Sequence, residues 1–214
     1  MNPICLLLLI PILFAVLHDR TGKYPFSLLV TVSCMISVFL WSGPWITAAY
    51  LLSVVGDYFM AHSGGKNGDR MLLGGIAGFF LAHACFLGQS LAHADFSGKR
   101  LLWLIPAGVI ALGYAVFLFK VLYPSIPDTA LKIAATAYTG ISLCVLTASL
   151  LSSAPPLPKT LFCLGIALIL FSDTLIALSR FLKWKKLSRA VCPTYFACHI
   201  LVAASVMAEA GFLG

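Results

Sequence analysis

Long apolar stretches follow one another along this chain, with only short polar breaks between them. A helix that crosses the hydrocarbon core of a bilayer needs about 20 mostly apolar residues, and eight stretches reach or approach that length. They cover residues 3–17, 26–41, 45–62, 71–90, 101–119, 129–151, 159–181 and 191–213. The stretches are apolar on all sides and lack the alternation of membrane-barrel strands. We therefore predict an all-α, polytopic membrane helical bundle of about eight transmembrane helices.

The breaks between these stretches carry turn-forming residues and are too short to hold a second domain. Examples are Ser42-Gly43-Pro44, the segment 63–68, Tyr123-Pro124 and the segment 155–158. We therefore expect residues 1–214 to form a single integral membrane domain. The first stretch is interpreted as a helix and not as a signal peptide, because no basic residue precedes it and no small-residue cleavage site ends it.

The composition excludes several classes of protein. Hydrophobic residues make up 61% of the chain and charged residues 10%, whereas ordinary soluble domains are about half apolar and a quarter charged. A disordered protein, a soluble enzyme and a nucleic-acid-binding module are therefore excluded. The formal net charge of +7 favours contact with anionic lipid headgroups. We expect membrane lipids as partners and no nucleic acid, and the oligomeric state is left open.

The loop charges predict an orientation. Eleven lysines and arginines fall in the odd-numbered loops and three in the even-numbered loops, which places the odd loops in the cytoplasm and both termini on the other side. The eleven are Arg20, Lys23, Lys66, Arg70, Lys120, Lys132, Arg180, Lys183, Lys185, Lys186 and Arg189. The compact loops and the lack of a retrieval signal favour the bacterial inner membrane, with the endoplasmic reticulum membrane expected for a eukaryotic protein.

The seven cysteines match no metal-binding spacing, and their number is odd. All fall within or beside apolar stretches, so we expect small buried hydrophobic residues and no disulfide framework.

Three acidic residues fall within the predicted spans: Asp57, Asp173 and Glu209. Glu209 is expected at a solvated helix end. Asp57 and Asp173 are expected about 7 and 12 Å from the same membrane surface, from a rise of about 1.5 Å per residue. Each acid follows a small residue and precedes an alanine by four positions, and the two are 116 residues apart. This similarity indicates either two four-helix halves or chance. Intramembrane acids mark functional sites.

Other polar side chains are expected near this level. Tyr138 lies in the sixth stretch, and Tyr195 and His199 are four residues apart in the eighth, so they share one helix face. His83 is expected closer to the membrane midplane. Taken singly, a tyrosine fits an interfacial anchor and a histidine fits a packing residue. Together with the two acids they indicate a site.

Two buried carboxyl groups suit general acid–base chemistry. Burial and a neighbouring acid favour the protonated form of one carboxyl group while the other stays ionised. The sequence has no serine nucleophile elbow and no HExxH motif. A zinc site would need His83, His199, Asp57 and Asp173 to converge, and the absence of a His-x3-His pair favours a site without metal.

The segment from Leu164 to Phe181, which contains Ser172-Asp173-Thr174-Leu175-Ile176-Ala177, resembles the signature of the YhhN family of lysoplasmalogenase-like membrane proteins. Gly56-Asp57, Phe80-Leu81-Ala82-His83 and Tyr195-Phe196-Ala197-Cys198-His199 resemble the same pattern, although a Gln is expected at the place of His199. The resemblance implies hydrolysis of the vinyl ether bond of lysoplasmalogens, to a fatty aldehyde and glycerophosphocholine or glycerophosphoethanolamine, with no cofactor.

On this reading Asp57 and Asp173 are the catalytic pair, and Tyr138, Tyr195, His199 and His83 contribute to substrate binding. A vinyl ether opens when its β-carbon is protonated, and water then attacks the resulting cation, a logic shared with glycoside hydrolysis. The basic cluster Lys183, Lys185, Lys186 and Arg189 suits the substrate phosphate, or reflects membrane orientation alone.

Three alternatives stay open. A small proton- or ion-coupled transporter would use the same acids as relays, although transporters usually carry helices broken at the midplane. A zinc-dependent lipid hydrolase would contain bound metal. A non-catalytic lipid-binding or assembly protein would have no turnover.

Overall fold

The computed structural model describes residues 3–65 and 67–213, with the side chains of Pro3 and Cys5 left out. Its eight α-helices are α1 (Leu9–Thr21), α2 (Tyr24–Val38), α3 (Pro44–Ala61), α4 (Gly68–Ala92), α5 (Leu104–Val116), α6 (Thr129–Leu150), α7 (Pro156–Phe181) and α8 (Ser188–Glu209). Within the described ranges no strand is formed, and one isolated bridge pairs Ala94 with Ser152. The predicted all-α helical bundle is confirmed.

Prolines and glycines set several helix boundaries. Pro44 and Pro156 are the first residues of α3 and α7, where the missing N–H leaves no helical hydrogen bond unmade. Gly22 ends α1 in the left-handed conformation with φ of 64°, which glycine adopts without strain. Asp128 caps α6, because its side chain accepts from the backbone N–H of Leu131 at 3.0 Å.

Two helical regions are longer than the sequence predicted. The first stretch, predicted over residues 3–17, begins as a 3-10 segment η1 (Pro3–Leu8) and continues through α1 to Thr21. The fifth, predicted over 101–119, comprises η2 (Gly98–Trp103), α5, a π-helical segment η3 (Phe117–Leu122) and η4 (Tyr123–Ser125). The expected break at Tyr123-Pro124 is instead a 3-10 turn, since proline is tolerated in a first turn.

Five helical segments of the described chain are long and apolar enough to cross a membrane. They are Gly68–Ala92, Gly98–Ser125, Thr129–Leu150, Pro156–Phe181 and Lys185–Glu209. The last of them consists of the short 3-10 segment η5 (Lys185–Leu187) and α8. Large apolar side chains cover the outer surface. Ile105, Val109 and Leu112 of α5 are 67–68% exposed, an exposure that suits contact with lipid and not with water. The chain is therefore a membrane protein.

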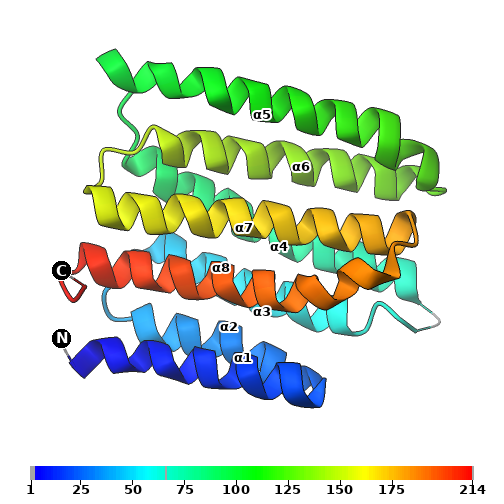
Figure 1. The fold of residues 1–214 in the computed structure, drawn as a ribbon, viewed down its shortest axis with the longest axis horizontal. Helices are drawn as coiled ribbons and strands as arrows, with labels where there is room; N and C mark the ends of the chain where they lie inside the picture. The colour runs from blue at the N-terminus through cyan, green and yellow to red at the C-terminus, as the bar shows by residue number, and fades with distance from the viewer. Residues whose placement is uncertain (1–2, 66, 214) are drawn as a thin grey trace.

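The eight helices form two halves of four, α1–α4 and α5–α8. Figure 1 shows α5 and α1 at opposite edges, with α6 and α2 next to them and the pairs α7–α8 and α3–α4 in the centre. The contacts between helices repeat in the two halves. The third and fourth helices of each half pack together, as α3 with α4 and as α7 with α8. The second helix of each half packs on the third helix of its own half and on the fourth helix of the other half, as α2 does on α3 and α8 and as α6 does on α7 and α4. Both chain ends lie at the same end of the bundle (Figure 1).

The cysteine prediction is wrong in part. Cys34 and Cys198 are buried in the core, but Cys85, Cys163 and Cys192 are only partly buried and Cys144 is exposed. An apolar stretch in a membrane helix faces lipid as readily as protein, so apolar neighbours do not indicate burial of a cysteine. All six are free thiols, and the side chain of Cys5 lies outside the described residues.

Glycines allow α3 and α4 to approach closely next to Asp57. A Cβ atom placed on Gly78 of α4 would lie 3.0 Å from the Cα and N of Gly56 of α3. A Cβ atom on Gly75 would lie 2.8 Å from the side chain of Met60. Small residues permit such contacts between membrane helices, and this contact fixes the helix turn that carries Asp57.

Candidate active site

Asp57 lies near the end of α3 and is almost fully buried, with 7% of its surface exposed. Oγ1 of Thr31 in α2 donates a hydrogen bond of 2.8 Å to its Oδ2 atom. The hydroxyl groups of Tyr24 and Tyr195 lie near this carboxyl group, outside hydrogen-bond geometry, and are themselves buried without a partner. Buried polar groups are normally hydrogen-bonded, so both hydroxyls are available as donors to the Asp57 carboxyl group or to a bound ligand.

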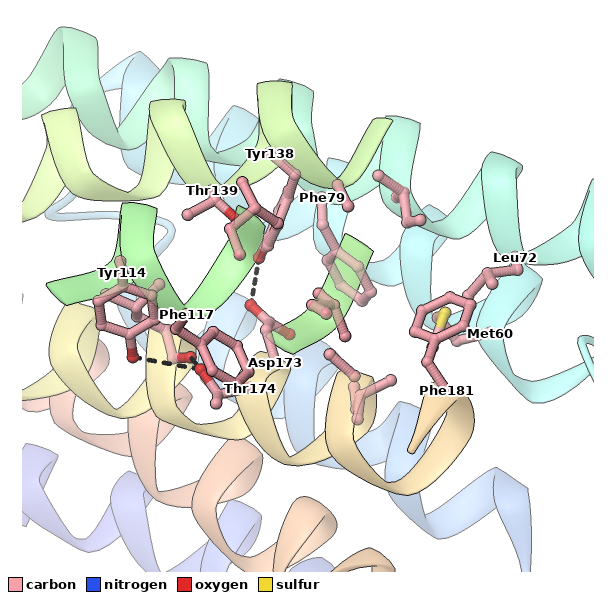
Figure 2. Close-up of a pocket in the computed structure, with 17 residues that line it drawn as sticks. Met60, Leu72, Phe79, Tyr114, Phe117, Tyr138, Thr139, Asp173, Thr174 and Phe181 are labelled. Atoms are coloured by element: carbon pink, nitrogen blue, oxygen red, sulfur yellow. Dashed lines mark hydrogen bonds between the residues drawn. The ribbon is translucent and has the colours of Figure 1, made fainter. Parts of the chain in front are cut away.

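Asp173 lies in the middle of α7 and accepts a hydrogen bond at Oδ2 from the hydroxyl group of Tyr138 in α6 (Figure 2). The next residue, Thr174, has its hydroxyl oxygen 3.2 Å from that of Tyr114 in α5. Asp173 is partly accessible, from two cavities that it lines. Three helices of the second half therefore meet at this acid.

The first of these cavities, which we call the α2-side cavity, has a volume of about 320 Å³. Both Asp57 and Asp173 line it. The remaining lining residues are His18, Gly22, Tyr24, Ser27, Met60, Ala61, Phe79, Ile176, Val191, Cys192 and Tyr195. Two acids that are 116 residues apart in the sequence thus face one cavity, because α3 and α7 run in the same direction and converge at the centre of the bundle.

The second cavity, the α6-side cavity, lies between α4, α5, α6 and α7 and has a volume of about 100 Å³. Asp173 and Tyr138 line it, and most of the other lining side chains are apolar (Figure 2). Met60, Phe79, Asp173 and Ile176 line both cavities. The two cavities therefore adjoin at Asp173.

The two histidines lie behind the tyrosines of the site. The ring of His83 is 5.0 Å from that of Tyr138, and the ring of His199 is 4.5 Å from that of Tyr195. Both histidines are 1% exposed, and neither lines the α2-side or the α6-side cavity. The structure therefore brings Asp57, Asp173, Tyr138 and Tyr195 to the cavities and leaves the histidines outside them.

Both imidazole rings carry unpartnered nitrogens. Nδ1 of His83 is hydrogen-bonded at 2.8 Å to the carbonyl oxygen of Phe79, but its Nε2 and both ring nitrogens of His199 have no partner. Tyr50 donates to the backbone carbonyl oxygen of His199 at 2.7 Å. The histidine rings thus contact the tyrosines that face the acids, without reaching the acids themselves.

Sequence reasoning did not identify Thr31, Tyr24 or Phe79 as site residues. Thr31 is fully buried within an apolar helix, and a polar residue in such a place was the signal that could have indicated it. Phe79 lines both cavities but has no sequence signal, because phenylalanine is ordinary in a membrane helix.

The four residues that a zinc site would need, His83, His199, Asp57 and Asp173, do not converge on one point. Among the described residues, no group of three or more His, Cys, Asp and Glu side chains lies close enough to hold a metal ion. Asp57 and Asp173 face the cavities, whereas His83 and His199 lie behind tyrosine rings.

The basic cluster lies at the end of the bundle where α7 connects to α8. Lys183, Lys185, Lys186 and Arg189 are all exposed. Arg180 instead pairs with Asp69 at 3.3 Å and joins α7 to the start of α4. Lys66 lies outside the described residues. At the other end of the bundle, Glu209 is exposed at the last turn of α8.

Comparison with protein-family models matches residues 24–206 to the YhhN family, which covers most of the chain and all of the residues described above as facing the acids. Comparison with curated proteins and with solved structures gives no match.

Proposed function

Because the chain belongs to the YhhN family, we propose that it is a membrane hydrolase that cleaves the vinyl ether bond of lysoplasmalogens. The products are a fatty aldehyde and glycerophosphocholine or glycerophosphoethanolamine. The observation that carries this proposal is the position of Asp57 and Asp173, which line one cavity next to hydroxyl donors.

The chemistry needs two carboxyl groups in different protonation states. A protonated acid gives its proton to the β-carbon of the vinyl ether, and the positive charge develops on the ether oxygen and the α-carbon. A carboxylate stabilises this cation and then takes a proton from the attacking water. The resulting hemiacetal collapses to the aldehyde and the glycerol hydroxyl. Two acids that line one cavity inside a membrane bundle suit both roles.

The substrate also explains the location in the membrane. A lysoplasmalogen has one hydrocarbon chain and a phosphate headgroup, so it reaches the cavity from the bilayer with its headgroup near the surface. The exposed basic cluster at the start of α8 provides positive charge for that phosphate. In this proposal the basic end faces the cytoplasm and both chain ends face the other side.

The test uses the purified protein in detergent with lysoplasmenylethanolamine, and fatty aldehyde release is measured. Asp57→Asn and Asp173→Asn should each abolish release. Glu209→Gln is the matched control, because Glu209 is an exposed acid in the same helical bundle, and it should retain activity.

Two further arms separate the alternatives. An ester lysolipid offered side by side should not be cleaved, and a chelator should not change the rate. Wild-type turnover in either aspartate variant would contradict the paired-acid mechanism. Loss of activity with chelator would favour a zinc-dependent lipid hydrolase instead.

A further inference from the structure

The third and fourth helices of the two halves, α3–α4 and α7–α8, correspond at a constant offset of 116 residues. Asp57 and Asp173 are 116 residues apart, and so are His83 and His199. Each acid lies on the third helix of its half and each histidine on the fourth. Because each half contains an even number of helices, the halves run in the same direction, and a rotation about an axis along the bundle exchanges them (Figure 1).

The two cavities are equivalent under this exchange. On α3, α4 and α7, six residues of the α6-side cavity have their counterparts, 116 residues away, in the lining of the α2-side cavity. The pairs are Met60 with Ile176, Ile76 with Cys192, Phe79 with Tyr195, Asp173 with Asp57, Ile176 with Met60, and Ala177 with Ala61. Asp57 therefore lines the α2-side cavity as Asp173 lines the α6-side cavity, and Asp173 also reaches the α2-side cavity where the two adjoin.

The equivalent cavities differ in polarity. Leu72, Met60 and Phe181 lie together at one end of the α6-side cavity (Figure 2), and its wall from α5 and η3 is largely aliphatic and aromatic. The α2-side cavity is larger and contains His18, Ser27 and the unpartnered hydroxyls of Tyr24 and Tyr195. A hydrocarbon chain suits the first environment, and polar groups and water suit the second.

We propose that the two halves divide a single-chain lipid between them. The first carbons of the hydrocarbon chain, next to the scissile bond, lie in the α6-side cavity, whose volume of about 100 Å³ is too small for a whole long chain. The glycerol, its phosphate and the attacking water lie in the α2-side cavity. The scissile bond then lies at the junction, beside Asp173. The identity of the lipid as a lysoplasmalogen rests on the proposed function, whereas the chain site applies to any lipid with one chain.

This arrangement assigns a role to each acid. The carbon that receives the proton belongs to the hydrocarbon chain, and Asp173 is the acid that lines the chain cavity. Water attacks the carbon attached to the ether oxygen, and Asp57 lines only the α2-side cavity. Asp173 therefore donates its proton to carbon, and Asp57 takes a proton from the water that adds to the cation.

The cycle closes without a further reactant. When the bond between the hemiacetal carbon and the glycerol oxygen breaks, Asp57 returns its proton to that oxygen. The hemiacetal hydroxyl gives its proton to Asp173 as the aldehyde forms. Both acids then regain their starting protonation states, and one water has been consumed.

The chain site is tested by binding, independently of turnover. Ala177→Phe fills the α6-side cavity, and Ala61→Phe puts the same ring at the equivalent position of the α2-side cavity. The probes are decanoyl lysophosphatidylethanolamine and glycerophosphoethanolamine, which has the same headgroup and no chain, titrated into the purified protein in detergent. We expect Ala177→Phe to weaken the binding of the decanoyl lipid about tenfold more than that of glycerophosphoethanolamine. Ala61→Phe should weaken both equally.

Phe181→Ala gives an opposite change and serves if Ala177→Phe does not fold. It enlarges the α6-side cavity and should increase the preference for the probe that carries a chain. Equal losses for both probes in Ala177→Phe, or an unchanged preference in Phe181→Ala, would overturn the chain site. Chain-selective binding without aldehyde release by the wild type would refute the proposed function and leave the chain site standing.

The acid assignment is tested by chemical rescue. In Asp57→Ala the cation still forms but no base activates water, so added azide, which attacks without losing a proton, should restore vinyl ether consumption several-fold. Asp173→Ala cannot form the cation and should not respond. Consumption and the azide adduct are followed by mass spectrometry. Rescue of Asp173→Ala, or of neither variant, would overturn the assignment.

Discussion

Replacing Gly78 with alanine perturbs the closest approach between α3 and α4. The new Cβ atom would lie 3.0 Å from the Cα and N of Gly56 and 3.4 Å from the carbonyl oxygen of Leu52. These are backbone atoms and cannot rotate away, so the two helices must separate by a few tenths of an ångström. Gly56 directly precedes Asp57, so the displacement reaches the carboxyl group that lines the α2-side cavity.

The size of the effect follows from two opposing terms. Overpacking costs about 1–3 kcal/mol, and alanine is favoured over glycine inside a helix by about 1 kcal/mol. We therefore expect a net loss of stability of up to about 2 kcal/mol. In a protein of this length, 1 kcal/mol corresponds to about 2–4 °C in melting temperature.

Gly108→Ala in α5 is the matched control. Nothing lies within 4 Å of a Cβ atom placed on Gly108, so this variant gains helix propensity without overpacking. The two variants should therefore differ by about 1–3 kcal/mol, which is roughly 2–12 °C in melting temperature. The measurement is thermal unfolding in one detergent, together with aldehyde release at a temperature where both variants are folded.

If Gly78→Ala melts at or above the temperature of Gly108→Ala, α3 and α4 do not approach as closely as the structure indicates. If stability falls while aldehyde release is unchanged, the contact does not position Asp57.

Three other predictions concern single side chains. Tyr138→Phe removes the hydroxyl donor to Asp173 and should lower turnover about tenfold to a hundredfold, the effect expected for a hydrogen bond to the carboxylate that forms when Asp173 gives up its proton; an unchanged kcat would rule out that role. His199→Gln should retain aldehyde release and thermal stability, because the ring nitrogens of His199 have no partner to lose, and a loss of activity with normal folding would instead give this residue a direct role. In the loop after α4, the hydroxyl and backbone N–H of Ser97 donate to Asp95 and lower the pKa of its carboxyl group below the usual value. The ionised Asp95 carboxyl group therefore stabilises the fold above its unfolded pKa of about 4, and this contribution is lost as the pH falls through the folded pKa. The wild type should melt at a higher temperature than Asp95→Asn at neutral pH, and the difference should vanish at acidic pH. A difference in melting temperature that persists at acidic pH would contradict this role of Asp95.

The hydrophobic stretches alone predicted an all-α membrane bundle. In the hydrocarbon core every backbone N–H and C=O group must be hydrogen-bonded within the protein, which only helices and closed barrels achieve. The acids Asp57 and Asp173 were also evident from sequence, since a charged group is costly in a bilayer and stands out against apolar neighbours. The offset of 116 residues between the two acids was visible too. The similarity of the residues around them, however, fitted an internal repeat and a chance resemblance equally well.

Only the tertiary structure decided which side of each helix faces protein. A membrane helix is apolar toward lipid and toward its neighbours alike, so periodicity does not distinguish the two sides, and Cys144 was wrongly expected to be buried. For the same reason the sequence did not pair Thr31 with Asp57 or Tyr138 with Asp173. The division into a polar and an apolar cavity depends on contacts between helices far apart in the chain, which packing alone establishes.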